Sequence, residues 1–264
     1  MKKAQQAIFN NTKRLFHYQD FDKKRLEDTL LTNRIYCSNP INFNDPWDMK
    51  PLVKTLDNEQ ERNEYIEHLR SAMIQNDIPQ DMIDKLLNTP SWIDYMAERS
   101  ATDSWKTFEE HFRVYCLTPK PDNLLMWSHY ANKHQGICLE FDTDNQIFGS
   151  AWEVEYHSEY PYCSWKTDFD IIRLALTKAK CWEYEEEYRL LPKTECANKI
   201  LQQEKIMVVD EYNKLTFPSE ALKSIIIGCK ANYEDIKNFI HSLRPDLQIK
   251  RAIIQRNRYG IDIK

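Results

Sequence analysis

The chain has 264 residues, of which 42% are hydrophobic and 29% are charged, and its formal net charge at pH 7 is -5. This length fits one large domain or two small ones, and the acidic balance argues against a broad nucleic-acid-binding surface while leaving room for a local basic cleft. Because the chain holds only four glycines, it contains no Gly-rich phosphate loop, dinucleotide fingerprint or G-x-S-x-G elbow.

Apolar periodicity and chain breakers predict an alternation of strands and helices. The expected order is a strand at 14–18, a helix at 22–31, a strand at 33–37, a turn-rich run at 38–46, a helical stretch at 57–112, a strand at 112–117, a helix at 124–130, strands at 137–141 and 152–156, a helix at 169–181, a strand at 182–189, a hairpin from 205–209 and 214–217, a strand at 222–228, a helix at 233–243 and a strand at 249–254. This pattern predicts an α+β fold with a mixed, largely antiparallel central sheet, flanking helices and an inserted helical segment.

We expect a single α+β domain over residues 1–264, with residues 57–112 as a helical insertion or lid. That stretch is polar, and Pro79 and Pro90 are expected to break it into separate helices. Residues 222–228 form a nearly continuous apolar run, as expected of a central strand.

The middle of the chain carries a helix with ring-bearing side chains. Asp122 can cap it, and Gly136 fits its end. Trp127 and Tyr130 are three residues apart on one helix face, which is the ordinary mark of core packing, with a stacking platform as the alternative. His129 lies five residues before the next histidine, beyond the i, i+4 spacing of a helical metal pair. No metal ligands are therefore assigned.

The segment Trp182-Glu-Tyr-Glu-Glu-Glu-Tyr-Arg189 is the most informative stretch. As a strand it places Glu185, Glu187 and Arg189 on one face. Two carboxylates and a guanidinium in a row are costly to bury and are explained where a polar ligand crosses the sheet. The alternative for Glu187 is a structural ion pair with Arg189 or another arginine.

Composition also bears on the compartment. No apolar run approaches the roughly 20 residues that a membrane span needs, so no membrane partner is expected. The basic start is not followed by an apolar stretch, unlike a signal peptide. Seven scattered cysteines form no C-x-x-C pair, so neither a zinc knuckle nor a disulfide framework is indicated. We expect a cytoplasmic protein; its oligomeric state cannot be inferred.

Three motifs, taken together, point to a family. They are Asn42-Phe-Asn-Asp-Pro46, the run Leu125-Met-Trp-Ser-His-Tyr-Ala131 followed by His134-Gln-Gly-Ile-Cys-Leu-Glu-Phe-Asp142, and Trp182 to Arg189. In this order they resemble the bacterial domain-of-unknown-function family 2971 (DUF2971), from about Leu15 to the C-terminus. The middle motif is long and specific.

The layout also looks like the ADP-ribosyltransferase superfamily, whose members place a His or Arg early, an aromatic or Ser in the middle and a Glu late. The matching positions are His17 on the early strand, Tyr115 or the helix from Trp127 to Tyr130, and Glu185 or Glu187. That fold holds nicotinamide nucleotides without a Gly-rich fingerprint. The resemblance implies NAD as co-substrate, an unknown protein or nucleic-acid target, and a role as a bacterial toxin or phage-defence effector.

The resemblance and the residues themselves together give the expected site, although Asn44 and Asp45 are most often turn formers, with a loop that lines a pocket as the functional alternative. Glu187 and Glu185 are the expected catalytic residues, and the expected substrate-binding residues are His17, Tyr18, Asn44, Asp45, Tyr115, Trp127, His129, Tyr130 and Arg189. Two alternatives stay open. One is a metal-dependent nuclease using Glu185, Glu187 and Asp45 or Asp142, since carboxylates suit hydrophilic cations. The other is a non-catalytic binding module in which the Glu–Arg array is a structural lock.

Overall fold

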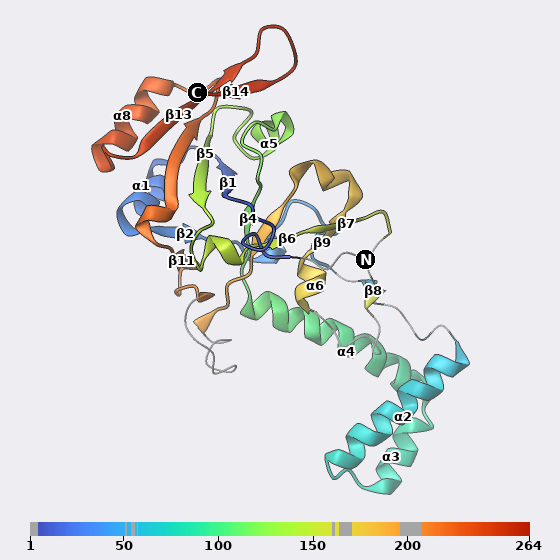
Figure 1. Cartoon of the computed structure of the whole chain (residues 1–264). Helices are drawn as coiled ribbons and strands as arrows, with labels where there is room; N and C mark the ends of the chain where they lie inside the picture. The colour runs from blue at the N-terminus through green and yellow to red at the C-terminus, as the bar shows by residue number, and fades with distance from the viewer. Residues whose placement is uncertain are drawn as a thin grey trace.

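A five-stranded sheet is at the centre of the fold, in the order β1-β5-β12-β13-β14 (Figure 1). Its strands are β1 (Arg14–Gln19), β5 (Ile137–Asp142), β12 (Leu222–Ile227), β13 (Gln248–Ile254) and β14 (Ile261–Ile263). The structure is a computed structural model, and it describes residues 5–50, 52–53, 56, 58–159, 162–163, 171–195 and 207–264. The predicted α+β class with a mixed, largely antiparallel sheet is confirmed: β12 and β13 run parallel, and the other neighbours are antiparallel.

The central strands are buried on both faces, which explains their apolar sequences. Alternate residues of β5 and β12 enter two different clusters, as the period of two in a strand requires. One cluster includes buried side chains of helices α1 (Lys23–Thr32) and α8 (Tyr233–Leu243), and the other includes those of α5 (Leu124–His129). The sheet is therefore covered by α1 and α8 on one face and by α5 on the other (Figure 1).

A second sheet continues from the edge strand β1. Its order is β4-β10-β6, from β4 (Tyr115–Leu117), β10 (Tyr188–Leu190) and β6 (Trp152–Glu153). An isolated bridge between Phe16 and Thr118 joins β1 to the end of β4. Residues of the early, middle and late segments of the chain thus come side by side.

Short strand pairs surround these sheets. They are β2 (Arg34–Tyr36) with β11 (Lys214–Thr216), β3 (Leu52–Val53) with β8 (Tyr162–Cys163), and β7 (Glu155–His157) with β9 (Thr177–Ala179). The β7–β9 pair is parallel and holds Lys178 at its centre, opposite Tyr156.

The polar stretch at 57–112 is helical, as expected. It forms α2 (Glu59–Gln75), α3 (Gln80–Leu87) and α4 (Pro90–His111), and Pro79 and Pro90 lie at the starts of the last two. The helices share a core of their own, which includes Tyr65 and Ile83. Figure 1 shows α2 and α3 projecting away from the sheets, with α4 leading back to them.

The prediction of a strand over 182–189 is wrong for most of that segment. Residues Lys180–Glu185 form a 3₁₀ helix, Glu186 is left-handed with φ 45°, and the strand β10 starts only at Tyr188. The alternation of residue types in this segment therefore does not reflect the two faces of a strand. The left-handed residue reverses the chain, and this turn brings Glu185 and Glu187 to the same place.

Other expectations also need correction. The helix expected at 169–181 is only α6 (Ile171–Ala175) and is followed by β9, while residues 169–170 lie outside the described part. The segment 214–217 pairs with β2 instead of forming a hairpin with 205–209, of which 205–206 are not described. Residues 152–156 are divided between β6 and β7.

The two residues predicted to mark the ends of the helix at 124–130, Asp122 and Gly136, do not have those roles. Asn123, not Asp122, accepts the capping hydrogen bonds at the start of α5. Gly136 has no positive φ and does not end the helix. A Cβ at Gly136 would lie 2.3 Å from the carbonyl oxygen of Gln19 and 2.9 Å from the backbone of Ala131. Glycine is needed there for close backbone packing.

None of the helices in the described part of the chain combines the length and the apolar character that a membrane-spanning helix needs.

The packing at Gly136 can be tested by adding one methyl group. We expect Gly136→Ala to lower the free energy of unfolding by about 3 kcal/mol, because rigid backbone must move. The control is Gly260→Ala, whose Cβ would meet only the side chain of Gln255 at 2.3 Å. That side chain can rotate away by giving up two exposed hydrogen bonds, with Arg258 and Asp262, so the loss should be under about 1 kcal/mol. Urea denaturation measures both, and equal losses would contradict the packing argument.

Candidate functional site

A cavity of about 520 Å³ lies where β1, β4 and α5 meet the loop before Asp48 and the segment from Lys178 to Glu187. Among its lining residues are His17, Tyr18, Asn44, Tyr115, His129, Tyr130, Glu185 and Glu187. The structure therefore brings most of the sequence-predicted site residues together, although they come from distant parts of the chain.

Three predicted site residues do not border this cavity. Arg189 is fully buried behind the carboxylates. Trp127 is also fully buried; it packs edge-on against Tyr18 and donates from Nε1 to the carbonyl oxygen of Pro121. Its side chain therefore belongs to the core. Asp45 caps the backbone of Trp47 and lines a neighbouring cavity. Its position agrees with the turn-forming role of such residues.

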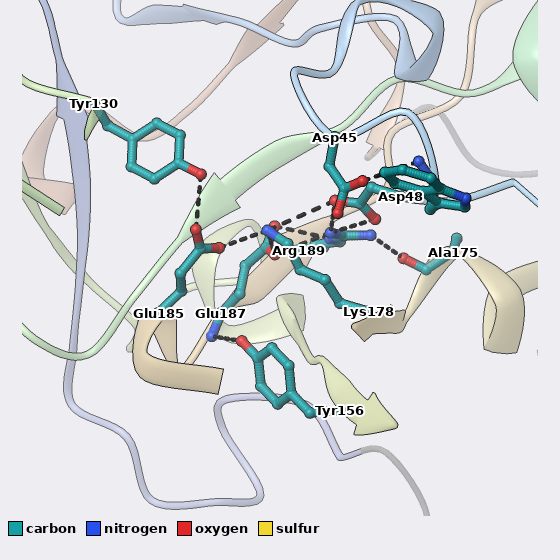
Figure 2. A network of polar contacts seen from close by, with 10 residues as sticks. Asp45, Asp48, Tyr130, Tyr156, Ala175, Lys178, Glu185, Glu187 and Arg189 are labelled. Atoms are coloured by element: carbon teal, nitrogen blue, oxygen red, sulfur yellow. Dashed lines mark hydrogen bonds and ion pairs between the residues drawn. The ribbon is translucent and has the colours of Figure 1, made fainter. Parts of the chain in front are cut away.

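Arg189 fixes one end of a buried charge network (Figure 2). Its Nε donates to Glu187 Oε1 at 2.8 Å, and its Nη2 donates to Asp48 Oδ2 at 2.7 Å. Nη1 donates to the carbonyl oxygen of Ala175 at 2.7 Å. A planar guanidinium suits such a fork of acceptors, because its donors lie in fixed directions.

Lys178 is the second cation of the network. Its Nζ is 2.5 Å from Glu185 Oε2, 3.0 Å from Glu187 Oε2 and 3.6 Å from Asp48 Oδ2. The lysine is 8% exposed, so its charge is tolerated only because these carboxylates surround it. Burial lowers the pKa of Lys178, but the attraction of Glu187, Asp48 and Glu185 outweighs it and raises that pKa above the ordinary value.

The two glutamates are not equivalent. Burial raises the pKa of Glu187, but Arg189 and Lys178 more than offset that effect and hold the pKa well below its usual range. For Glu185, burial dominates and raises the pKa, and the negative charge of Glu187 adds to it. Three carboxylates share two cations here, and Glu185 is the carboxylate that Arg189 does not contact. Glu185 is therefore the one that takes up a proton most readily.

Two tyrosines hold the glutamates, one through a carboxylate and the other through the backbone. Tyr130 donates to Glu185 Oε1 at 2.7 Å, and the backbone N–H of Glu187 donates to the hydroxyl of Tyr156 at 2.7 Å. Burial raises the pKa of the nearby Cys116 thiol well above its ordinary value, and the negative charge of Glu187 adds to this. The thiol is thus protonated at pH 7.

His17 borders the same cavity and is stacked on Tyr115, with ring centroids 4.1 Å apart. Its Nδ1 is 2.8 Å from the carbonyl oxygen of Cys116, which accepts a hydrogen bond and so requires the proton on Nδ1. Burial lowers the pKa of His17 to about 4. The ring is neutral at pH 7, and Nε2 is left as an acceptor.

Two further buried groups at the cavity have no hydrogen-bond partner in the part of the chain that the structure describes. They are the hydroxyl of Tyr115 and the amide Nε2 of Gln19. Buried polar atoms normally find partners, so two unmet donors in residues that line one cavity are unusual. Arg25, which is exposed and borders the same cavity, supplies a positive charge near them.

Sequence reasoning missed several of these residues. Lys178 was hidden in a predicted helix, and Asp48 follows the Asn-Asp-Pro motif by two positions. Their only signal was indirect: a strand with two carboxylates and one arginine needs another buried cation. Gln19 and Arg25 carried no signal, because they reach the cavity only through the fold.

The network also bears on metal binding. No group of three or more His, Cys, Asp or Glu side chains within the described ranges could hold a metal ion. Lys178 already neutralises Glu185 and Glu187, and Asp142 is paired with Arg14 and Lys223 elsewhere. The residues proposed for a nuclease centre are thus not assembled into one.

Removing one cation should test the network as a structural lock. We expect Arg189→Met to lower the free energy of unfolding by about 3–5 kcal/mol, because it leaves Glu187 and Asp48 buried without their main partner. The matched control is Arg62→Met, which removes an ion pair to the exposed Asp94 and should cost under about 1 kcal/mol. Chemical denaturation compares the two, and similar losses would refute the lock.

The lowered pKa of His17 predicts a pH dependence of stability. The unfolded histidine takes up a proton below its ordinary pKa of 6.5, whereas the folded one does so only near a pKa of about 4. The unfolded state therefore binds more protons, and stability should fall by on the order of 3 kcal/mol from this group as pH drops from 6.5 to 4. Urea titrations of His17→Gln should lack this part of the loss, and those of His241→Gln should retain it.

Comparison with known proteins gives one match. Residues 126–190 match the family described as a protein of unknown function (DUF2971), and this segment contains Tyr130, Lys178, Glu185 and Glu187. No curated protein and no solved structure matches the chain. The match supports the resemblance to DUF2971 over the segment that supplies the carboxylate side of the cavity.

Proposed function

We propose that this protein is an ADP-ribosyltransferase-like enzyme that uses NAD to modify a macromolecular target, acting as a bacterial toxin or phage-defence effector. One observation carries the proposal. A neutral histidine stacked on a tyrosine lines the same cavity as two carboxylates whose pKa values are shifted in opposite directions. Pairs of acids whose pKa values are driven apart by their surroundings are typical of acid–base sites.

The cavity is compatible with a nucleotide. Its volume of about 520 Å³ falls in the range of small-molecule and cofactor sites. The unmet donors of Tyr115 and Gln19 and the charge of Arg25 suit a ligand rich in oxygen acceptors and phosphate. No Gly-rich loop is needed, because these side chains would supply the contacts.

NAD, when bound, supplies an ADP-ribosyl group by cleavage of its bond to nicotinamide. His17 would accept a hydrogen bond at Nε2 from a ribose hydroxyl, since its proton is committed to the carbonyl oxygen of Cys116. Glu187 stays ionised and is held by Arg189, so its negative charge is fixed in place. A fixed charge of this kind stabilises positive charge that develops on a sugar ring as the leaving group departs.

Glu185 fits the role of proton acceptor. Its raised pKa makes it the more basic of the two carboxylates, and it borders the cavity. Tyr130 holds Oε1 and Lys178 holds Oε2, which fixes the plane of the carboxylate. It would take a proton from the acceptor group of the target as the new bond forms. This assignment moves the chemistry from Glu187, the first choice on sequence grounds, to Glu185.

The alternatives gain less support. A magnesium-dependent nuclease would need Glu185 and Glu187 to coordinate a cation where Lys178 Nζ lies, within 3.0 Å of both carboxylates. The binding-module hypothesis accounts for Arg189 and Glu187 as a lock. It gives no role to the neutral His17 or to the unmet donors around it.

The proposal is tested by nicotinamide release from NAD, with water as the acceptor where no target is known. We expect Glu185→Gln to lower the rate by at least about 100-fold with little change in KM, because the side chain acts in the transition state. The neighbouring Glu186→Gln is the control, since that side chain is exposed. It should keep the wild-type rate.

The fold must be intact for this result to count. Denaturation curves of both variants are therefore compared with wild type before the rates. If wild-type protein releases no nicotinamide from NAD, or if Glu185→Gln releases it at the wild-type rate, the proposal fails. Magnesium-dependent cleavage of a nucleic acid that is lost in Glu185→Gln would support the nuclease instead.

A further inference from the structure

The loop between β13 and β14 forms a second, separate surface. Residues 255–260, Gln-Arg-Asn-Arg-Tyr-Gly, connect the two strands and rise above α5 in Figure 1. The backbone N–H of Gln255 donates to the carbonyl oxygen of Gly260 at 3.0 Å, which closes the loop. The amide of Gln255 also receives a hydrogen bond from Nε of Arg258, at 2.5 Å. The loop is thus held in shape by its own contacts.

A cavity of about 520 Å³ lies beneath this loop, against the turns after α5 and β12. Three cations border it: Lys230, Arg256 and Arg258. No carboxylate does, among the residues that the structure describes, and none of the three cations forms an ion pair there. In a chain with a net charge of -5, unpaired cations around one hollow make a local positive site.

Tyr259 adds an aromatic surface to the cations. It borders the same cavity and is 100% exposed. A tyrosine at a loop tip gains nothing from folding when its ring is left in water. Cations beside an exposed ring are the combination that binds phosphates and stacks a base.

The position of this surface relates it to the first cavity. Leu124, at the start of α5, borders the hollow under the loop, whereas Met126 and Tyr130 border the cavity with Glu185. One short helix therefore separates the two hollows. A polymer lying along the loop would pass the start of α5, and the other end of that helix leads to Tyr130 beside Glu185.

We propose that the β13–β14 loop is a docking surface for single-stranded nucleic acid. Lys230, Arg256 and Arg258 contact its phosphates, and Tyr259 stacks on a base. A single strand is preferred over a duplex because its base faces are open to an aromatic ring, whereas stacking neighbours cover them in a duplex. This surface does not depend on NAD chemistry.

The test uses the full chain and a fluorescein-labelled oligothymidylate of about 12 nucleotides, which is within the usual site size of such proteins. Fluorescence anisotropy gives Kd over a range of salt concentrations. For three phosphate contacts the slope of log Kd against log salt should be about 2. The triple variant Lys230→Gln, Arg256→Gln, Arg258→Gln should reduce this slope nearly to zero.

The control triple variant, Lys24→Gln, Lys85→Gln, Lys106→Gln, removes the same charge from exposed lysines elsewhere and should keep the slope. Tyr259→Ala should weaken binding about tenfold, as expected for loss of one stacked base, while Tyr212→Ala, at another exposed tyrosine, should not. These side chains lie outside the core, so thermal denaturation should be unchanged.

Several results would overturn the proposal. They are failure of wild-type protein to bind the oligonucleotide at low salt, equal affinity of the two triple variants, and equal affinity for a duplex of the same length. Displacement of the oligonucleotide by millimolar pyrophosphate, with no effect of Tyr259→Ala, would identify a small-anion site instead. Because the assay contains no NAD, its outcome is separate from that of nicotinamide release.

Discussion

The geometry of the proposed catalytic cavity depends on how two buried cations are shared among three carboxylates. Lys178 and Arg189 join the loop that carries Asp48 to the segment with Glu185 and Glu187. No long strand links these parts, so the ion pairs set their spacing. Buried charges are tolerated only in complete sets, because a missing partner leaves a desolvated charge uncompensated. The wall of the cavity is therefore either assembled as a whole or lost.

The same arrangement divides the work between the two glutamates. Arg189 is fully buried and binds Glu187 and Asp48, so its positive charge is neutralised by those two carboxylates. Glu185 keeps only its share of Lys178 and the hydroxyl of Tyr130. Two glutamates that are two positions apart can thus serve different roles, Glu187 as part of a structural lock and Glu185 as a proton acceptor. No sequence signal distinguishes them. The structural and functional readings of the motif are both needed, each for a different residue.

The sequence predicted elements whose burial follows the chain's own periodicity. The helix at 233–243 and the central strand over 222–228 are examples. The helix has one apolar face, the strand is apolar along most of its length, and both have clear ends. The sequence-based prediction was wrong at residues 182–189, where the alternation of Glu and Tyr is the pattern typical of a strand. A left-handed Glu186 is favoured there by tertiary contacts that no local pattern records. The site residues His17, Tyr115 and Glu185 could be named from their order, but Lys178 and Asp48 could not. Their role arises only when separate segments meet.

Charge is also organised over longer distances. The chain is acidic as a whole, yet the three described cations at the hollow under the β13–β14 loop form no ion pair, whereas Lys178 and Arg189 at the first cavity are neutralised by carboxylates. A polyanion would be repelled by the protein in general and attracted at one place. Since α5 borders both hollows at different ends, that place lies one short helix away from the carboxylates. Electrostatics would thus select where a nucleic acid can lie, and buried ion pairs would keep the neighbouring acids from responding to it.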